Sequence, residues 1–238
     1  MSLLICHEFK SPNYNLRKNL KLIDTIIIHY TGMKDAKSAL NYLCSQKSKV
    51  SAHYLIDETG KLFQIVDDSN IAWHAGVSQW IDRKNLNETS IGIELVNPGH
   101  DYGYEEFTLE QYIILEKLIK LLISKYDIQI DRILGHSDIA PSRKLDPGEK
   151  FNWQRLAEKK LSIWPKTILD LPNDIYSEKL LYNLLYSIGY DVDNHYKDSI
   201  IAFKRHFIPN DVNSNINKIL LKIAYSVYVE FLKIRSYY

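Results

Sequence analysis

The sequence lacks the features that mark disulfide-rich, nucleic-acid-binding and membrane-spanning proteins. Its 238 residues include only two cysteines. Cys6 and Cys44 lie far apart without metal-type spacing, so neither a disulfide framework nor a zinc knuckle is indicated. Lys and Arg number 30 against 29 Asp and Glu, which leaves a formal net charge of +1. With so little net charge, we expect no nucleic-acid partner and no attraction to an acidic membrane.

Long apolar runs are also missing. No stretch approaches the ~20 apolar residues of a membrane-spanning helix, so we expect no transmembrane segment. The apolar run at residues 3–6 is too short for the core of a secretion signal. The remaining composition, 45% apolar and 25% charged residues, is typical of a soluble globular protein that can bury a sizeable core.

Strand and helix patterns alternate over the first two thirds of the chain. Apolar runs at residues 25–30 and 90–96 predict buried strands, and alternating runs on either side of residues 58–60 predict a hairpin. Thr108 and Gln111 form a capping-box pattern, after which apolar residues recur at helical spacing. This order predicts an α/β fold with a mixed central sheet flanked by helices.

The pattern changes after Trp164. Residues 166–176 contain Pro172 and show no periodicity, as is typical of a linker. Three amphipathic stretches follow, which predict a small three-helix domain over residues 177–238. We therefore predict an α/β domain over residues 1–165, a linker over 166–176 and the helical domain after it.

The segment "GHSDIAPSRKLDPG", residues 135–148, carries many chargeable groups on a backbone restrained by two prolines. His136 begins it, Asp146 lies near its end, and His29 ends the predicted strand at 25–30. Two histidines and one carboxylate are a ligand set of catalytic zinc sites, which leave the fourth position open to water. A single histidine is more often a packed core or surface residue than a metal ligand, so spacing alone does not establish this site.

Glu94 is the second unusual residue. It lies within the apolar strand predicted at 90–96, and a buried carboxylate costs free energy unless it is paired or functional. A salt bridge to Lys144 or Arg143 is the structural alternative to a catalytic role.

Five motifs, taken in order, carry a resemblance to a known family: "IIIHYT", "SAHYLID", "IAWHAGVSQW", "SIGIELVN" and "GHSDIAPSRKLDPG". Over about residues 22–165 the sequence resembles the zinc-dependent N-acetylmuramoyl-L-alanine amidases of the amidase-2 family, which are related in fold to the peptidoglycan recognition proteins. The resemblance implies a hydrolase that cleaves the amide between N-acetylmuramic acid and L-alanine in peptidoglycan or soluble muropeptides, with Zn²⁺ as cofactor. The helical tail resembles the peptidoglycan-binding module of some envelope amidases.

The same resemblance implies a role for each motif residue. It places the zinc ligands at His29, His136 and Asp146, the general base at Glu94 and a lysine that stabilises the oxyanion at Lys144. Four further residues fall in the motifs as candidates for lining the substrate pocket, with core packing or hydrogen bonding behind the metal ligands as the alternative. They are His53, Trp73, His74 and Arg143.

Two rival hypotheses remain open at this point. One is a non-catalytic muropeptide-binding protein that uses the same groove, against which the complete ligand set argues. The other is an enzyme that acts on soluble anhydro-muropeptides in the cytoplasm and not in the bacterial cell envelope. The helical tail favours the periplasm, whereas the lack of a recognisable export signal favours the cytoplasm. The sequence does not fix the oligomeric state.

Overall fold

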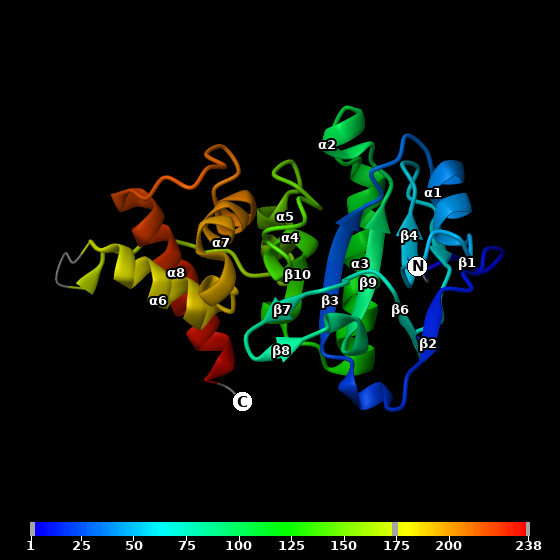
Figure 1. Ribbon diagram of the computed structural model, residues 1–238, viewed down its shortest axis with the longest axis horizontal. Coiled ribbons are helices and arrows are strands. Elements are labelled where there is room, and N and C mark those ends of the chain that lie inside the picture. The colour runs from blue at the N-terminus through cyan, green and yellow to red at the C-terminus, as the bar shows by residue number, and fades with distance from the viewer. Residues whose placement is uncertain (1–2, 173–175, 237–238) are drawn as a thin grey trace.

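A six-stranded mixed sheet forms the centre of the computed structural model, which describes residues 3–172 and 176–236 (Figure 1). The neighbouring strands pair in parallel except for the β4–β5 hairpin, which is antiparallel as the sequence predicts. The strand order is β1 (Ile5–Cys6), β5 (Leu62–Gln64), β4 (Tyr54–Ile56), β9 (Ser90–Leu95), β3 (Thr25–Tyr30) and β10 (Ile133–Gly135). The predicted strands at 25–30 and 90–96 are therefore confirmed to within one residue.

The two faces of β3 bury different side chains. Ile26 and Ile28 belong to the apolar cluster that α3 (Leu109–Tyr126) covers, whereas Ile27 belongs to a cluster on the other face. Because side chains alternate along a strand, His29 points away from α3 as Ile27 does. The capping box at Thr108 and Gln111 begins α3, as predicted. Helix α1 (Ala36–Leu43) packs on the face opposite α3, against side chains of β4 and β5.

Short elements fill the connections between the main strands and helices. They are β2 (Tyr14–Leu16) paired with β6 (Asn70–Ala72), β7 (Gln79–Trp80) paired with β8 (Arg83–Lys84), the helices α2 (Gly99–Tyr102), α4 (His136–Ile139) and α5 (Trp153–Glu158), and the 3₁₀ turns η1 (Leu20–Leu22), η2 (Leu86–Glu88) and η3 (Ile130–Arg132). Among the described residues, no helix has the length and apolar character needed to span a membrane.

Three helices follow the α/β part, as predicted: α6 (Glu178–Ile188), α7 (Val192–Phe207) and α8 (Lys218–Arg235). They lie beside the β10 edge of the sheet (Figure 1). One apolar cluster runs through both parts, because Leu185 and Phe203 of the tail share it with Leu134 and Ile139. The division into two domains stays a prediction, and residues 173–175 of the predicted linker lie outside the described residues.

A buried carboxylate joins the tail to the α/β part. Asp138 of α4 is 1% exposed, and its two oxygens accept hydrogen bonds from the Tyr190 hydroxyl at 2.8 Å and from His206 Nδ1 at 2.8 Å. The backbone N–H of Gly135 donates to the same carboxylate at 2.8 Å. The tail therefore supports the chain segment that starts at His136.

Replacing Tyr190 with phenylalanine tests this junction. Tyr190→Phe leaves one oxygen of a buried carboxylate without its donor, so we expect the free energy of unfolding to fall by about 1–3 kcal/mol. Tyr182→Phe is the matched control, because the Tyr182 hydroxyl donates to Asp193 at the surface, where the loss should stay within about 0.5 kcal/mol. Urea unfolding of both variants measures the difference. An equal loss of unfolding free energy in the two variants would show that the hydrogen bond to Asp138 stabilises the protein no more than a surface hydrogen bond does.

Candidate metal centre

The parallel pairing of three strands brings the two motif histidines and Glu94 together. The register sets His29 of β3 opposite Glu94 of β9, and Gly135 of β10 opposite Ile28 of β3. His136 follows Gly135 directly, so it emerges next to His29. All three side chains therefore lie at the carboxyl end of the sheet, where α/β folds place their ligand sites.

A compact turn returns Asp146 to the same point. The backbone N–H of Ser137 donates to the Asp146 carbonyl at 2.8 Å, which closes the segment that begins at His136. Within it, the backbone N–H groups of Arg143 and Lys144 both donate to the Ala140 carbonyl at 3.0 Å. The loop is thus held by its own backbone, and Asp146 lies beside His136.

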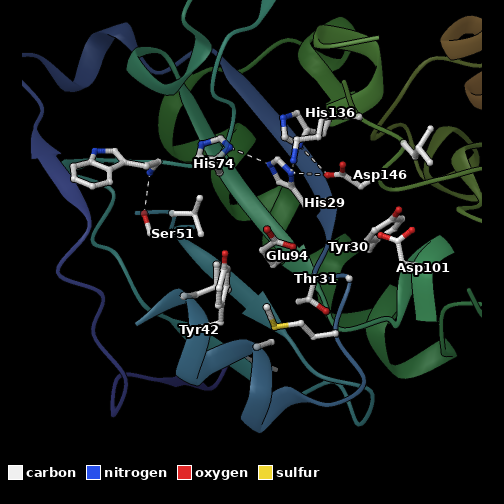
Figure 2. A pocket seen from close by; sticks show the side chains of 18 of the residues that line it. His29, Tyr30, Thr31, Tyr42, Ser51, His74, Glu94, Asp101, His136 and Asp146 are labelled. Atoms are coloured by element: carbon white, nitrogen blue, oxygen red, sulfur yellow. Dashed lines mark hydrogen bonds and ion pairs between the residues drawn. The ribbon is translucent and has the colours of Figure 1, made fainter. Parts of the chain in front are cut away.

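The three candidate ligands meet through one atom each (Figure 2). His29 Nδ1 lies 2.8 Å from Asp146 Oδ2 and 3.0 Å from His136 Nδ1, and His136 Nδ1 lies 3.0 Å from Asp146 Oδ2. The residues are 2%, 7% and 3% exposed in the order His29, Asp146 and His136. We call these three atoms the ligand triangle.

The ligand triangle fits a tetrahedral metal ion. Three linear hydrogen bonds cannot close a triangle of this size, because its corners are near 60° and hydrogen bonds weaken steeply when they bend. A tetrahedral ion with bonds of 2.0–2.1 Å separates its ligands by roughly 3.3 Å, a few tenths of an ångström more than the sides of the triangle. Within the described part of the chain, no fourth His, Cys, Asp or Glu joins the group. The arrangement therefore leaves one coordination position open.

Electrostatics keep two of the candidate ligands, His29 and Asp146, in the forms that bind a cation. Burial, reinforced by the neighbouring His136, lowers the pKa of His29 to about 4, so its ring is neutral at physiological pH. Burial would raise the pKa of Asp146, but the attraction and hydrogen bonds of His136 and His29 outweigh it and hold that pKa well below its usual range. Asp146 therefore carries a negative charge.

The ligand triangle opens into a cavity of about 390 Å³. Glu94 and Lys144 line it together with the three ligands. Figure 2 shows the Glu94 carboxylate next to His29, and Tyr42 extending from α1 toward the same region. The residues predicted to carry the chemistry are thus brought to one cavity.

One carboxylate oxygen of Glu94 is buried without a hydrogen-bond partner. This atom, Oε2, is shielded from solvent, and no ion pair within 4.0 Å joins the carboxylate to Lys144 or Arg143. Burial, and then the negative charge of Asp146, raise the pKa of Glu94 well above its usual range, while the positive charge of Lys144 opposes the rise. A carboxylate with a raised pKa is a stronger base than an exposed one.

The four residues predicted as pocket candidates occupy different positions. Trp73, His74 and Arg143 line the cavity. His53 does not line it: the residue is 0% exposed, and its Nδ1 accepts a hydrogen bond from the backbone N–H of Gly92 at 3.0 Å. Its role in the described structure is to hold β9.

Among the cavity residues that sequence reasoning missed, three have ionisable side chains, namely Tyr30, Tyr42 and Asp101. Tyr30 directly follows His29 in a motif and could have been found on that ground. Asp101 comes from the short helix α2, which has no periodic signal, and Tyr42 lies on the exposed side of an ordinary amphipathic helix.

Comparison with known proteins gives the family. Residues 18–149 match the family model described as N-acetylmuramoyl-L-alanine amidase. The N-acetylmuramoyl-L-alanine amidase AmiD of Escherichia coli K12 is 35% identical over 215 residues, which are 80% of this chain and 77% of that protein. The 1,6-anhydro-N-acetylmuramyl-L-alanine amidase AmpD of Haemophilus influenzae is 35% identical over 63% of this chain and 89% of its own length.

Solved structures agree with the sequence comparison. AmiD from E. coli, in complex with the substrate anhydro-N-acetylmuramic acid-L-Ala-D-gamma-Glu-L-Lys, superposes with a TM-score of 0.77 at 32% identity and covers 88% of this chain and 90% of its own. AmpDh3 from Pseudomonas aeruginosa, in complex with anhydromuramic pentapeptide, gives 0.79 at 27% identity over 97% and 99%. The chain belongs to the N-acetylmuramoyl-L-alanine amidase family, a class of amide hydrolases, which confirms the resemblance and the predicted fold.

Removal of one ligand tests the metal centre. Asp146→Ala deletes the only anionic member of the ligand triangle, so bound divalent metal should fall from stoichiometric to near zero while the far-ultraviolet circular dichroism stays unchanged. Asp101→Ala is the matched control, since Asp101 lines the same cavity outside the triangle. Elemental analysis of both variants after dialysis against metal measures the outcome. Stoichiometric metal in Asp146→Ala would contradict the assignment.

Proposed function

We propose that this protein is a zinc-dependent amidase that hydrolyses the bond between the lactyl group of N-acetylmuramic acid and the L-alanine of the stem peptide. The observation that carries the proposal is the ligand triangle, which opens into the same cavity as the unpaired carboxylate of Glu94 and the side chain of Lys144. A buried ligand set with an open position, a base and a cation together suit hydrolysis of an amide.

The donor set favours zinc over other divalent ions. Two imidazole nitrogens and one carboxylate oxygen match the His and carboxylate ligands of catalytic zinc sites. Magnesium and calcium prefer sites built from oxygen atoms. When bound, zinc supplies Lewis acidity that lowers the pKa of a water molecule and polarises a carbonyl.

Glu94 is the general base of the proposed reaction. Its raised pKa and its unpaired oxygen allow it to accept a proton from the attacking water. After attack, the protonated carboxyl group can donate the same proton to the leaving amine of L-alanine. One residue thus serves as base and then as acid.

Lys144 is the second protein group that acts on the reacting atoms. It lines the cavity, and its positive charge reaches both Glu94 and His29. An ammonium group in this position stabilises the negative oxygen that forms on the scissile carbonyl. Glu94 thus transfers the proton while Lys144 stabilises the oxyanion in the same step.

The substrate proposed for the first assays is a soluble anhydro-muropeptide. Two relatives whose structures superpose over most of this chain hold an anhydro-N-acetylmuramic acid peptide and an anhydromuramic pentapeptide. A non-catalytic muropeptide-binding protein remains the rival, and the complete donor set together with Glu94 argues against it. Products of a defined muropeptide, identified by mass spectrometry with and without a chelator, separate the two functions.

The proposal also concerns the role of the helical tail and the compartment in which the enzyme works. We propose that the three tail helices make a second contact with polymeric peptidoglycan, because the tail sequence resembles a peptidoglycan-binding module. Such a contact favours the periplasm, whereas enzymes that act on soluble fragments can work in the cytoplasm. Binding of the full chain to intact sacculi distinguishes these two settings.

Substitution of Glu94 and Lys144 tests their roles. Glu94→Gln keeps the shape of the side chain and removes its basicity, so turnover should fall by on the order of 10²–10⁴. Lys144→Met keeps most of the stem and deletes the charge, so a fall of roughly 10²–10³ is expected. Zinc content should stay near wild type in both. Near-normal turnover in Glu94→Gln would leave that residue without a catalytic role, and loss of zinc would make it a metal ligand.

A competition experiment tests the tail in the intact protein. Full-length Glu94→Gln should sediment with purified sacculi, and it should still do so when excess soluble muropeptide fills the cavity, because the tail offers a second contact. Release of all bound protein by the muropeptide would show that the cavity alone binds peptidoglycan. Bovine serum albumin in the same tubes controls for trapping.

A further inference from the structure

A line of buried polar contacts runs from the ligand triangle through His74, which also lines the cavity, to Ser90 and the backbone beyond it. His29 Nε2 lies 3.0 Å from His74 Nδ1, and His74 Nε2 lies 3.3 Å from the Ser90 hydroxyl. The Ser90 hydroxyl donates in turn to the Leu86 carbonyl at 2.5 Å. His74 and Ser90 are 8% and 0% exposed, so protein groups, and not bulk water, decide how these atoms are protonated.

The Leu86 carbonyl at the end of this line determines which atom carries the proton in each of its hydrogen bonds. A carbonyl can only accept, so Ser90 uses its one proton on Leu86, and its oxygen accepts from His74 Nε2–H. The neutral ring of His74 then has a bare Nδ1, which accepts from His29 Nε2–H. His29 is left with its lone pair on Nδ1, which is the atom in the ligand triangle.

The residue after His74 fixes the second histidine ligand in the same way. His136 Nε2 lies 3.1 Å from the Ala75 carbonyl, to which it can only donate. Its bare nitrogen is therefore Nδ1, which also belongs to the ligand triangle. Two adjacent residues thus select the metal-binding tautomer of both histidines.

The segment formed by His74 and Ala75 is itself held from behind. The side-chain oxygen of Asn87 accepts from the backbone N–H of His74 at 3.0 Å and from that of Ala75 at 2.7 Å. The His74 ring also rests directly on Gly92 of β9, where an added Cβ would lie 2.5 Å from the ring. Glycine at this position of the strand gives the ring its space.

We propose that His74 and Ala75, held by Ser90 and Asn87, form a support that sets the tautomer and position of both histidine ligands. His74 and Ser90 are then positioning residues that act through His29, and His74 is more than a wall of the substrate pocket. The inference rests on the proposed function, because it presumes that a metal ion occupies the ligand triangle. A ring that presents N–H to the ion cannot bind it, so loss of the support weakens metal binding.

A pair of substitutions at His74 separates this role from simple packing. His74→Leu fills similar space without an acceptor, and the dissociation constant for Zn²⁺ should rise by roughly 10–100-fold. His74→Asn places an amide oxygen near the former Nδ1, so it should recover most of the affinity. Competition with a fluorescent chelator measures the dissociation constants, and urea unfolding of the metal-free proteins measures stability separately. A packing role alone predicts equal zinc affinity for the two folded variants.

A smaller change at Ser90 gives a second test that does not depend on replacing a ring. Ser90→Ala removes one oxygen and frees the His74 ring to reverse its tautomer, so we expect zinc to bind about 3–10-fold more weakly. Ser199→Ala is the matched control, because Ser199 is equally buried and lies in the tail with an unpartnered hydroxyl. It should bind zinc as the wild type does.

The outcomes distinguish this inference from the function on which it rests. If the wild-type protein binds no zinc, the proposed function fails. If the wild type binds zinc, and folded His74→Leu and Ser90→Ala bind it within about twofold of wild type, only the support is overturned. If His74→Leu does not fold, the Ser90→Ala result decides by the same criterion.

Discussion

A carboxylate buried between two imidazoles is the constraint on which the rest of the structure depends. Asp146 is 7% exposed and carries a charge, which is costly in a protein interior unless partners compensate for the lost water. His29 and His136 lie against it because parallel pairing of β3 with β10 delivers both to the same end of the sheet, and a cation held by the three residues would supply that compensation. The loop that starts at His136 then has to return Asp146 to this point, and its backbone hydrogen bonds do so.

The same burial prepares Glu94 for chemistry. Strand β9 lies between β3 and β4 in the middle of the sheet, and Glu94 extends from it to the wall of the cavity, where its side chain is partly shielded from water. Removal of water raises its pKa, and the charge of Asp146 raises it further. A structural salt bridge would have cancelled this effect, and no such ion pair forms. The same surroundings thus keep the candidate ligand Asp146 charged and raise the pKa of the Glu94 carboxylate.

Local patterns predicted much of the fold for physical reasons, whereas the assignment of the ligand set came from the family resemblance. The apolar runs of β3 and β9 and the capping box of α3 are local signals, and the structure has each of them. The difference between His53 and His74 is not local. Both occur in histidine motifs, but His53 holds the backbone of Gly92 while His74 contacts the candidate ligand His29. Only the three-dimensional packing around β9 decides which histidine has which role. The contacts of Asp138 with the tail depend on the same long-range packing.

The ligand triangle needs only a small rearrangement to accommodate an ion, because separate contacts hold each of its three residues in place. Its sides of 2.8–3.0 Å need to lengthen by only a few tenths of an ångström to suit a tetrahedral ion. His29 is held by the strand ladder and His74, His136 by Ala75, and Asp146 by the backbone of Ser137. The tail adds a contact one turn further on, at Asp138. A loop without such supports would have to order itself during binding and would lose affinity to the entropy of that step. The sheet, the segment at residues 74–75 and the tail are thus as much a part of the site as the residues that line its cavity.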